Sequence, residues 1–180
     1  MSDFEPRTNS NGIRYAKYWY SENPFYQTDP ADLGLPNCTC YAWGRFWEAG
    51  GPEPEKRPRL SLSDAKNWFD FTEDRYERGQ DPQEGAVICW TNPRYGHVAI
   101  VEKITNDSIF ISESAWGGFF FNYREIPRNG QYPISDYRLE GYIYNPYSGG
   151  HVTPGGGGVI DNKLFLFKRM MDKKKGYRWQ

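Results

Sequence analysis

The sequence has little of what marks several common classes of protein. Lys and Arg number 22 against 23 Asp and Glu, so the net charge is −1 and the basic excess of nucleic-acid-binding proteins is missing. No apolar run approaches the roughly 20 residues that span a bilayer. The first residues lack a basic region followed by an apolar one, so we predict no secretory signal. Nucleic acid and a membrane span are therefore poor hypotheses.

Cysteine and histidine are also scarce. The three cysteines, Cys38, Cys40 and Cys89, are too few for a disulfide scaffold and odd in number, so we expect at least one free thiol. There are two histidines, and His151 lies in a glycine-rich stretch where nothing would hold it. A mechanism that needs an imidazole base must therefore use His97.

Aliphatic side chains are the third shortage. Leu, Ile, Val and Phe together make up 33 of the 180 residues, a share that is typical of disorder only when the net charge is high. Here the charge is almost balanced, and 7 Trp, 14 Tyr and 11 Phe supply large apolar surfaces. We therefore predict a folded chain with an aromatic-rich core.

Turn residues divide the chain into segments. We expect an N-terminal arm over 1–24, a folded domain over 25–146, a glycine-rich linker over 147–158 and a short basic tail over 159–180. The linker contains four consecutive glycines, and the tail ends in a run of lysines.

Two helices are predicted near the start of the domain. Asn37 is a good N-cap, and the segment from Cys38 to Ala49 follows it without proline before a Gly-Gly-Pro stop. A second helix is predicted from Asp64 to about Arg75, because its apolar residues recur on one side.

Five strands are predicted after the helices. These segments are rich in β-branched and aromatic residues and are separated by short turns: 86–90, 97–104, 108–114, 119–126 and 139–144. Short links favour antiparallel neighbours. Helices followed by a run of strands predict an α+β fold with the N-terminal helices packed on an antiparallel sheet.

Cys38 occupies the first turn of the predicted helix, where unpaired backbone N–H groups and the helix dipole favour a thiolate. Such a cysteine can act as a nucleophile with a histidine from elsewhere in the fold, but a lone cysteine can also be buried and inert. Cys40 points about 200° away around the helix, and Cys89 lies in a strand, so we assign both to the core. A zinc site built from the three cysteines and His97 is a rival that lacks a second closely spaced pair.

Four motifs resemble the CHAP domains, the cysteine/histidine-dependent amidohydrolases/peptidases. They are Asn37-Cys-Thr-Cys-Tyr-Ala-Trp-Gly-Arg45, Pro82-Gln-Glu-Gly-Ala-Val-Ile-Cys-Trp90, Tyr95-Gly-His-Val-Ala-Ile-Val-Glu102 and Ile109-Phe-Ile-Ser-Glu-Ser114. They occur in the family's order and spacing and lie on the predicted helix and strands. The resemblance covers about residues 25–146.

This resemblance implies a papain-like fold and cleavage of an amide bond in bacterial peptidoglycan, by an N-acetylmuramoyl-L-alanine amidase or an endopeptidase. Carried over residue by residue, it makes Cys38 the nucleophile, His97 the base and Glu113 the group that orients His97. No cofactor is required. Such domains occur in phage endolysins, virion-associated lysins and bacterial wall-remodelling enzymes.

The sequence departs from the family pattern at three places. Asn37 stands where many members have Gln, and Ala115 stands where many have Asn. Some members bind calcium through acidic residues upstream of the cysteine, and Asp29 and Asp32 are the candidates here. Two carboxylates make a thin oxygen cage, so solvation in a loop is the alternative role.

The position of Glu113 strains the strand arithmetic. A three-residue connection would pair Val101 with Glu113 and leave Glu113 four residues, roughly 13 Å, from His97. A two-residue turn would put Glu113 on the wrong face of the sheet. A bulge, strong coiling or another pairing is needed to close the gap.

Aromatic faces suit a groove for sugars and peptide stems. Tyr95 and Trp116 are the groove candidates, together with Asn37, because they lie in loops beside His97 and Glu113. Core packing is the alternative role, and it applies to most of the other aromatic residues near the cysteine, among them Tyr41, Trp43 and Trp47.

Two other functions stay open. One is a wall-binding module that does not catalyse, and the other is a cysteine peptidase that acts on an amide outside the wall, such as a toxin. Without a signal we expect a phage-encoded protein released at lysis or a virion component, for which the tail would be the contact with other virion proteins. A cytoplasmic protein also fits.

Overall fold

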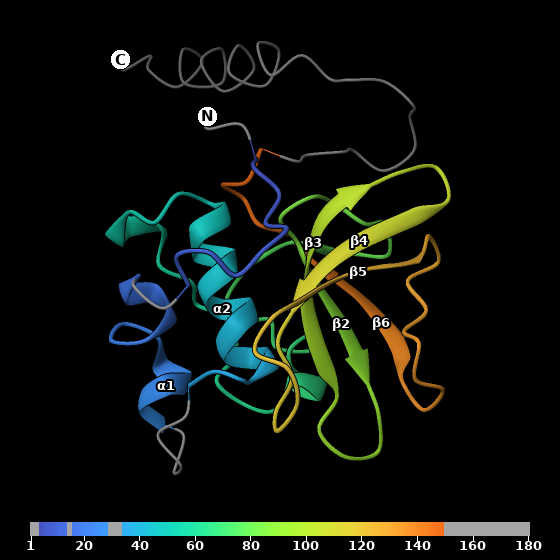
Figure 1. The fold of residues 1–180 in the computed structure, drawn as a ribbon, viewed down its shortest axis with the longest axis horizontal. Coiled ribbons are helices and arrows are strands. Elements are labelled where there is room, and N and C mark those ends of the chain that lie inside the picture. Colours follow the sequence, from blue (N-terminus) through green and yellow to red (C-terminus); the bar gives the residue numbers. More distant parts are fainter. Residues whose placement is uncertain (1–3, 14–15, 29–33, 150–180) are drawn as a thin grey trace, which may run out of the picture. The chain divides into compact units, whose positions relative to one another are not determined.

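A six-stranded antiparallel sheet and one long helix form the body of the protein (Figure 1). The computed structural model describes residues 4–13, 16–28 and 34–149. The helices are α1 (Pro24–Thr28) and α2 (Cys38–Ala49), and the strands are β1 (Arg78–Gly79), β2 (Val87–Thr91), β3 (His97–Ile104), β4 (Ser108–Glu113), β5 (Asn122–Pro127) and β6 (Arg138–Ile143). The predicted α+β class is confirmed. No helix among the described residues is long and apolar enough to cross a bilayer.

Helix α2 begins and ends where the sequence predicts. The Asn37 side chain accepts a hydrogen bond from the Thr39 N–H at 3.0 Å, which satisfies one of the backbone donors at the helix start. Gly50 caps the other end. The cap fixes the first helical residue as Cys38.

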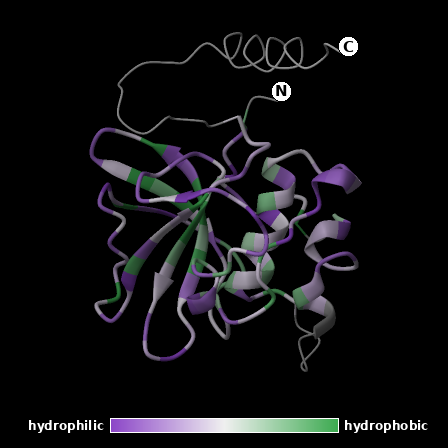
Figure 2. Cartoon of the chain, turned by 180° about the vertical axis from the view of Figure 1, so that it is seen from behind, coloured by the Kyte–Doolittle hydropathy of each residue, from purple (hydrophilic) through white to green (hydrophobic). Residues whose placement is uncertain are grey.

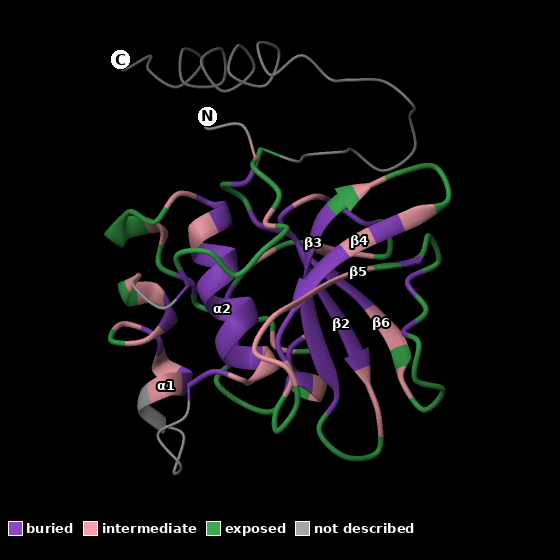
Figure 3. Cartoon of the chain, in the orientation of Figure 1, coloured by how far each residue is buried: buried purple, intermediate pink, exposed green. Residues whose placement is uncertain are grey.

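The sheet separates two apolar layers. On one face, α2 packs against β3, and Trp19, Trp43, Phe46, Trp47 and Trp68 are buried with Val98 and Ile100. On the other face, Trp90, Tyr132 and Tyr142 are buried with Ala99, Val101, Ile109 and Ile111. Figure 3 shows α2 and the central strands as almost wholly buried, and Figure 2 shows hydrophobic residues concentrated along the same elements. The aromatic-rich core is confirmed.

The strand order is β1-β6-β2-β3-β4-β5, so the last strand pairs with β2 near the centre of the sheet. The predicted register between β3 and β4 is wrong. Val101 pairs with Ile111, not with Glu113. The connection between the paired residues Ile104 and Ile109 has four residues instead of three, and a bulge interrupts β3 between Val101 and Lys103.

The predicted helix from Asp64 to Arg75 is also wrong. Only a short 3-10 turn forms, at Ala65–Asn67, and the chain then winds around the Arg78 side chain. The Arg78 guanidinium donates hydrogen bonds to backbone carbonyls of the predicted helix, those of Trp68, Phe69 and Phe71 among them, and to the Asp74 carboxylate. These tertiary hydrogen bonds replace those that a helix would make.

The N-terminal segment contributes to the core. Ile13 and Trp19, which the sequence places in an arm, are fully buried against the rest of the domain. The predicted linker beyond residue 149 and the predicted tail lie outside the described residues, as does His151.

We expect the substitution Arg78→Met to lower the free energy of unfolding by about 3 kcal/mol, because it removes the cation that pairs with the buried Asp74 carboxylate and the donor to several backbone carbonyls. Urea denaturation measures the change. The matched control is Arg138→Met, at the exposed first residue of β6, for which we expect less than about 0.5 kcal/mol. Equal effects of the two substitutions would contradict this role for Arg78.

Candidate active site

Cys38 is the one thiol of this chain that reaches the surface. It is half-buried at the first position of α2, whereas Cys40 and Cys89 are fully buried, as predicted. The Cys40 thiol contacts the Trp19 carbonyl at 3.7 Å and takes no part in the site. The helix cap therefore holds a single accessible sulfur at the positive end of the helix dipole.

His97 is held at the start of β3 by a tight turn. The Asn92 side-chain oxygen accepts hydrogen bonds from three successive backbone N–H groups, those of residues 94–96. Gly96 has φ +73°, and a Cβ there would meet the backbone of Lys66 and Trp90 at under 3 Å. Only glycine fits, so the residue that precedes His97 is set by this close approach.

The thiol, the imidazole and a carboxylate lie together, and the imidazole and the carboxylate are hydrogen-bonded. The Cys38 side chain lies close enough to His97 to raise the pKa of the imidazole. The His97 Nε2 atom lies 2.6 Å from Oε2 of Glu113. Because Nε2 is engaged by Glu113, Nδ1 is the ring nitrogen left for Cys38. The three residues that the sequence singled out for chemistry are thus brought together.

Glu113 is fully buried and contacts four side chains. Besides His97, its Oε2 accepts a hydrogen bond from the Tyr132 hydroxyl at 3.0 Å. Its Oε1 accepts one from Asn122 Nδ2 at 3.1 Å and lies 2.6 Å from Arg124 Nε, an ion pair rather than an aligned hydrogen bond. These contacts leave the carboxylate one orientation, which faces the imidazole.

Aromatic rings enclose the imidazole. Trp90 stacks on it with ring centroids 5.9 Å apart, and Tyr132 and Tyr137 lie at 5.1 and 6.1 Å. The Trp90 indole is itself fixed by a 2.7 Å hydrogen bond to the Gly130 carbonyl. The rings exclude water from His97, which strengthens its interaction with the Glu113 carboxylate.

Charge coupling sets the protonation of the site. Burial alone lowers the pKa of His97, but its hydrogen bonds and charge interactions with Cys38 and Glu113 outweigh burial and raise the pKa to about 9. Burial alone raises the pKa of Glu113. The hydrogen bond and charge of His97, together with the charge of Arg124, outweigh burial and bring the pKa of Glu113 below its ordinary value. At neutral pH the site therefore holds an imidazolium beside a carboxylate.

A further hydrogen bond ties the helix tip to the end of β4. The Asn37 backbone N–H donates to Ser114 Oγ at 3.1 Å, and that hydroxyl donates to the Phe119 carbonyl. Ser114 directly follows Glu113, so the cysteine end of α2 and the carboxylate end of β4 are joined through adjacent residues.

The predicted groove residues lie around Cys38, His97 and Glu113. Tyr95 is 68% exposed and Trp116 is 60% exposed, in the loops next to His97 and Glu113 respectively. Asn37 acts through its cap and its backbone. The other aromatic residues near the cysteine belong to the core, as the alternative reading held: Tyr41, Trp43 and Trp47.

No three metal-ligating side chains converge among the described residues. The zinc alternative therefore lacks its ligands, since Cys40 and Cys89 are buried in the core. Asp29 and Asp32 lie outside the described residues, so calcium binding stays a prediction.

The sequence did not single out the residues that hold Glu113. Asn122 and Arg124 are alternate residues of β5, and the Glu113–Asn122 pair puts both on the face of Glu113. A correct strand pairing would have found them. Tyr132 and Tyr137 come from a loop with no periodic pattern, and only the tertiary fold brings them to the imidazole.

The three central residues of the site lie within a segment that matches a known family model. Residues 28–115 match the model described as the CHAP domain. Cys38, His97 and Glu113 all fall inside these bounds, on the motifs that carry the resemblance.

The chain is also similar to named proteins. It is 38% identical over 94 residues to "Probable autolysin SsaALP" of Staphylococcus aureus (strain NCTC 8325 / PS 47), a match that covers 50% of this chain and 34% of that protein. The chain thus spans about a third of that relative's length. "The crystal structure of Ly7917" matches with a TM-score of 0.44 and 18% identity, over 62% of this chain and 54% of that one. "The crystal structure of Ly7917 with the hydrolyzing product of MDP" matches equally.

We expect proton NMR of the full chain to show His97 titrating near pH 9. The chain has two histidines, so the variant His97→Ala assigns the signal. Glu113→Gln removes the carboxylate charge and should move the titration towards the ordinary value of 6.5. The matched control is Glu125→Gln, at an exposed position of β5, which should leave the His97 titration unchanged.

An unchanged titration in Glu113→Gln would contradict the coupling between His97 and Glu113.

The raised pKa of His97 also predicts that the stability of the protein depends on pH. Because the folded pKa lies above 6.5, the stability linked to His97 is complete below pH 6.5 and is lost as the pH rises through about 9.

Proposed function

Residues 28–115 of this chain are a CHAP domain, and on that premise we propose that the protein hydrolyses an amide bond of bacterial peptidoglycan by cysteine nucleophilic catalysis. The observation that carries the proposal is the half-buried Cys38 thiol beside His97, whose imidazole is hydrogen-bonded to the buried Glu113. A nucleophile, a base and an orienting group in contact are what acyl transfer to cysteine requires.

The first half of the reaction forms a thioester. The Cys38 sulfur attacks the amide carbonyl carbon, and the negative charge moves to the carbonyl oxygen. The backbone N–H of Cys38 and the α2 dipole are placed to stabilise that oxyanion. His97, held as an imidazolium, gives its proton to the leaving nitrogen as the C–N bond breaks, and an amine is released.

The second half returns the enzyme to its resting state. His97, now neutral, takes a proton from water, and the resulting hydroxide attacks the thioester carbonyl. The C–S bond breaks, a carboxylic acid leaves and the Cys38 thiolate faces the imidazolium again. Glu113 keeps its charge throughout and holds the ring so that Nδ1 faces the sulfur.

A wall substrate is supported by the relative's name. A protein named as a probable autolysin shares 38% identity with this chain over 94 residues. Exposed Tyr95 and Trp116 flank the site and offer aromatic faces on which sugars and stem peptides can stack. An N-acetylmuramoyl-L-alanine amidase and an endopeptidase use the same chemistry. Which amide bond is cut therefore depends on how the loops around the site bind the substrate. A phage or virion source, with partners for the tail, rests on the family resemblance and stays a prediction.

We expect the protein to release soluble fragments from purified Staphylococcus aureus peptidoglycan and Cys38→Ala to release none, because no other accessible thiol can replace the nucleophile. Mass spectrometry of the fragments identifies the new ends: a stem freed at its L-alanine amine indicates an amidase, and a cut within the stem or cross-bridge indicates an endopeptidase.

The matched control is Cys89→Ala, which removes a fully buried thiol from β2 and leaves the site intact. It should give the wild-type fragments. Identical fragments from Cys38→Ala would show that Cys38 is not the nucleophile. A wild-type protein that sediments with walls but cuts no bond would instead be a binding module, and one that cuts only other peptide amides would be a peptidase with a substrate outside the wall.

The pH dependence follows from His97. Above its pKa of about 9 the imidazolium that protonates the leaving amine disappears, so we expect kcat/KM to fall about tenfold per pH unit in that range. Initial rates of wall solubilisation between pH 7 and 11 test this, with circular dichroism at each pH to check the fold. A rate that stays level to pH 11 would exclude His97 as the acid.

A further inference from the structure

The bulge in β3 consists of one residue, Glu102. Before the bulge, Ile104 pairs with Ile109 and Lys103 pairs with Phe110; beyond it, Val101 pairs with Ile111. Glu102 is therefore the extra residue, and no residue of β4 stands opposite it in the strand pairing. From that point towards His97 the register is shifted by one residue.

This shift decides which face of the sheet carries Glu113. With the bulge, Ile100 pairs with Ser112, so Glu113 continues opposite Ala99, two residues from His97 and on the same face. Without it, Glu113 would fall opposite Ile100, whose side chain packs in the layer under α2. The Glu113 carboxylate would then point away from the imidazole.

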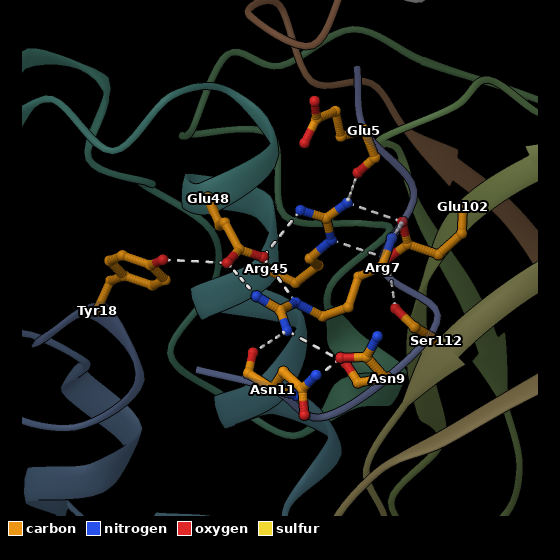
Figure 4. Close-up of polar contacts among 9 residues, drawn as sticks. All are labelled: Glu5, Arg7, Asn9, Asn11, Tyr18, Arg45, Glu48, Glu102 and Ser112. Carbon is orange, nitrogen blue, oxygen red and sulfur yellow. Dashed lines mark hydrogen bonds and ion pairs between the residues drawn. The ribbon is translucent and has the colours of Figure 1, made fainter. Parts of the chain in front are cut away.

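The bulge residue is held by a buried polar cluster. Glu102 is fully buried, and its carboxylate accepts hydrogen bonds from Arg45 Nε and Nη2, each at 2.8 Å. It also accepts one from Ser112 Oγ at 2.5 Å and one from the Arg7 backbone N–H at 2.8 Å. Figure 4 shows Arg45 between Glu102 and Glu48, with the N-terminal segment crossing beside Arg7.

The cluster joins the three elements that carry the proposed catalytic residues. Arg45 lies on α2, two helical turns after Cys38. Glu102 lies on β3 with His97, and Ser112 lies on β4 directly before Glu113. The Glu102 carboxylate on β3 thus contacts both α2, which carries Cys38, and β4, which carries Glu113.

A buried ion pair of this kind is a poor source of net stability. Removing two charges from water costs several kcal/mol per ion, and well-packed apolar residues often stabilise a protein as much or more. Fixing a register is the better-attested use of such a pair. Glu102 sits at the one point where the β3–β4 register changes.

We propose that Glu102 is a positioning residue: from the β3 bulge its carboxylate binds Arg45 and Ser112 and thereby fixes the register that turns Glu113 towards His97. The proposal deepens the proposed function, because the trio it aligns is the one assigned to catalysis. Its test, however, can be made without any wall substrate.

The test compares two glutamates of the same cluster. Glu102→Gln removes the charge at the bulge. Glu48→Gln is the matched control, because Glu48 also pairs with Arg45, at 2.9 Å, and contacts Arg7 and Tyr18 but neither β3 nor β4. A merely structural role would lower the melting temperature in both variants and leave the site unchanged in both.

Two measurements read the site directly. The first is the NMR titration of His97, whose titratable neighbours are Cys38, Glu113, Tyr132 and Tyr137. The second is the rate of Cys38 alkylation by iodoacetamide, which reports this thiol because the other two are fully buried. In Glu102→Gln we expect the titration to fall by at least one pH unit and the alkylation rate at pH 7 to change at least threefold, with wild-type values in Glu48→Gln.

Equal values for the two variants would overturn the proposal. If Glu102→Gln does not fold, Ser112→Ala decides, because it keeps the Arg45–Glu102 pair and removes the hydrogen bond to β4. It should lower the His97 titration by at least half a pH unit, and a wild-type titration would again overturn the proposal. A protein that shows these shifts but leaves walls intact would overturn the proposed function alone.

Discussion

The hydrogen bond between His97 and Glu113 is the contact on which the rest of the site depends. Neither group is stable in the core as a lone charge, since burial alone lowers the pKa of His97 and raises that of Glu113. Together, 2.6 Å apart, each keeps the other charged. The surrounding Trp90, Tyr132 and Tyr137 rings make this mutual dependence stronger because they exclude water.

The aromatic composition explains how a chain with so few aliphatic residues forms a core. Trp43 and Trp47 fill the layer between α2 and the sheet, while Trp90 and Tyr132 fill the opposite layer and also reach His97. Aromatic residues with a polar atom can do both tasks: the Trp90 indole and the Tyr132 hydroxyl each find a partner while their rings stay buried. The core and the wall of the site are therefore partly the same residues.

Local signals carried most of the correct predictions. The start of α2 was predictable because an Asn cap acts within three residues, and β3 was predictable because its β-branched residues and its bounding turns are local. The helix expected from Asp64 failed for the opposite reason, since its carbonyls bind the side chain of Arg78, which only the fold brings there. Glu113 was identified by family resemblance, while the register that aligns it depends on a bulge at Glu102 that strand patterns do not reveal.

By itself the sequence determined the fold class, the accessible cysteine at a helix tip and the one usable histidine, because caps, periodicity and residue scarcity are properties of short stretches. Tertiary structure alone decided that Glu113 faces His97, that Asn122, Arg124 and Tyr132 hold it, and that the imidazole is protonated at neutral pH. Those outcomes depend on burial and on distances between strands, and both arise only when residues far apart in the chain pack together.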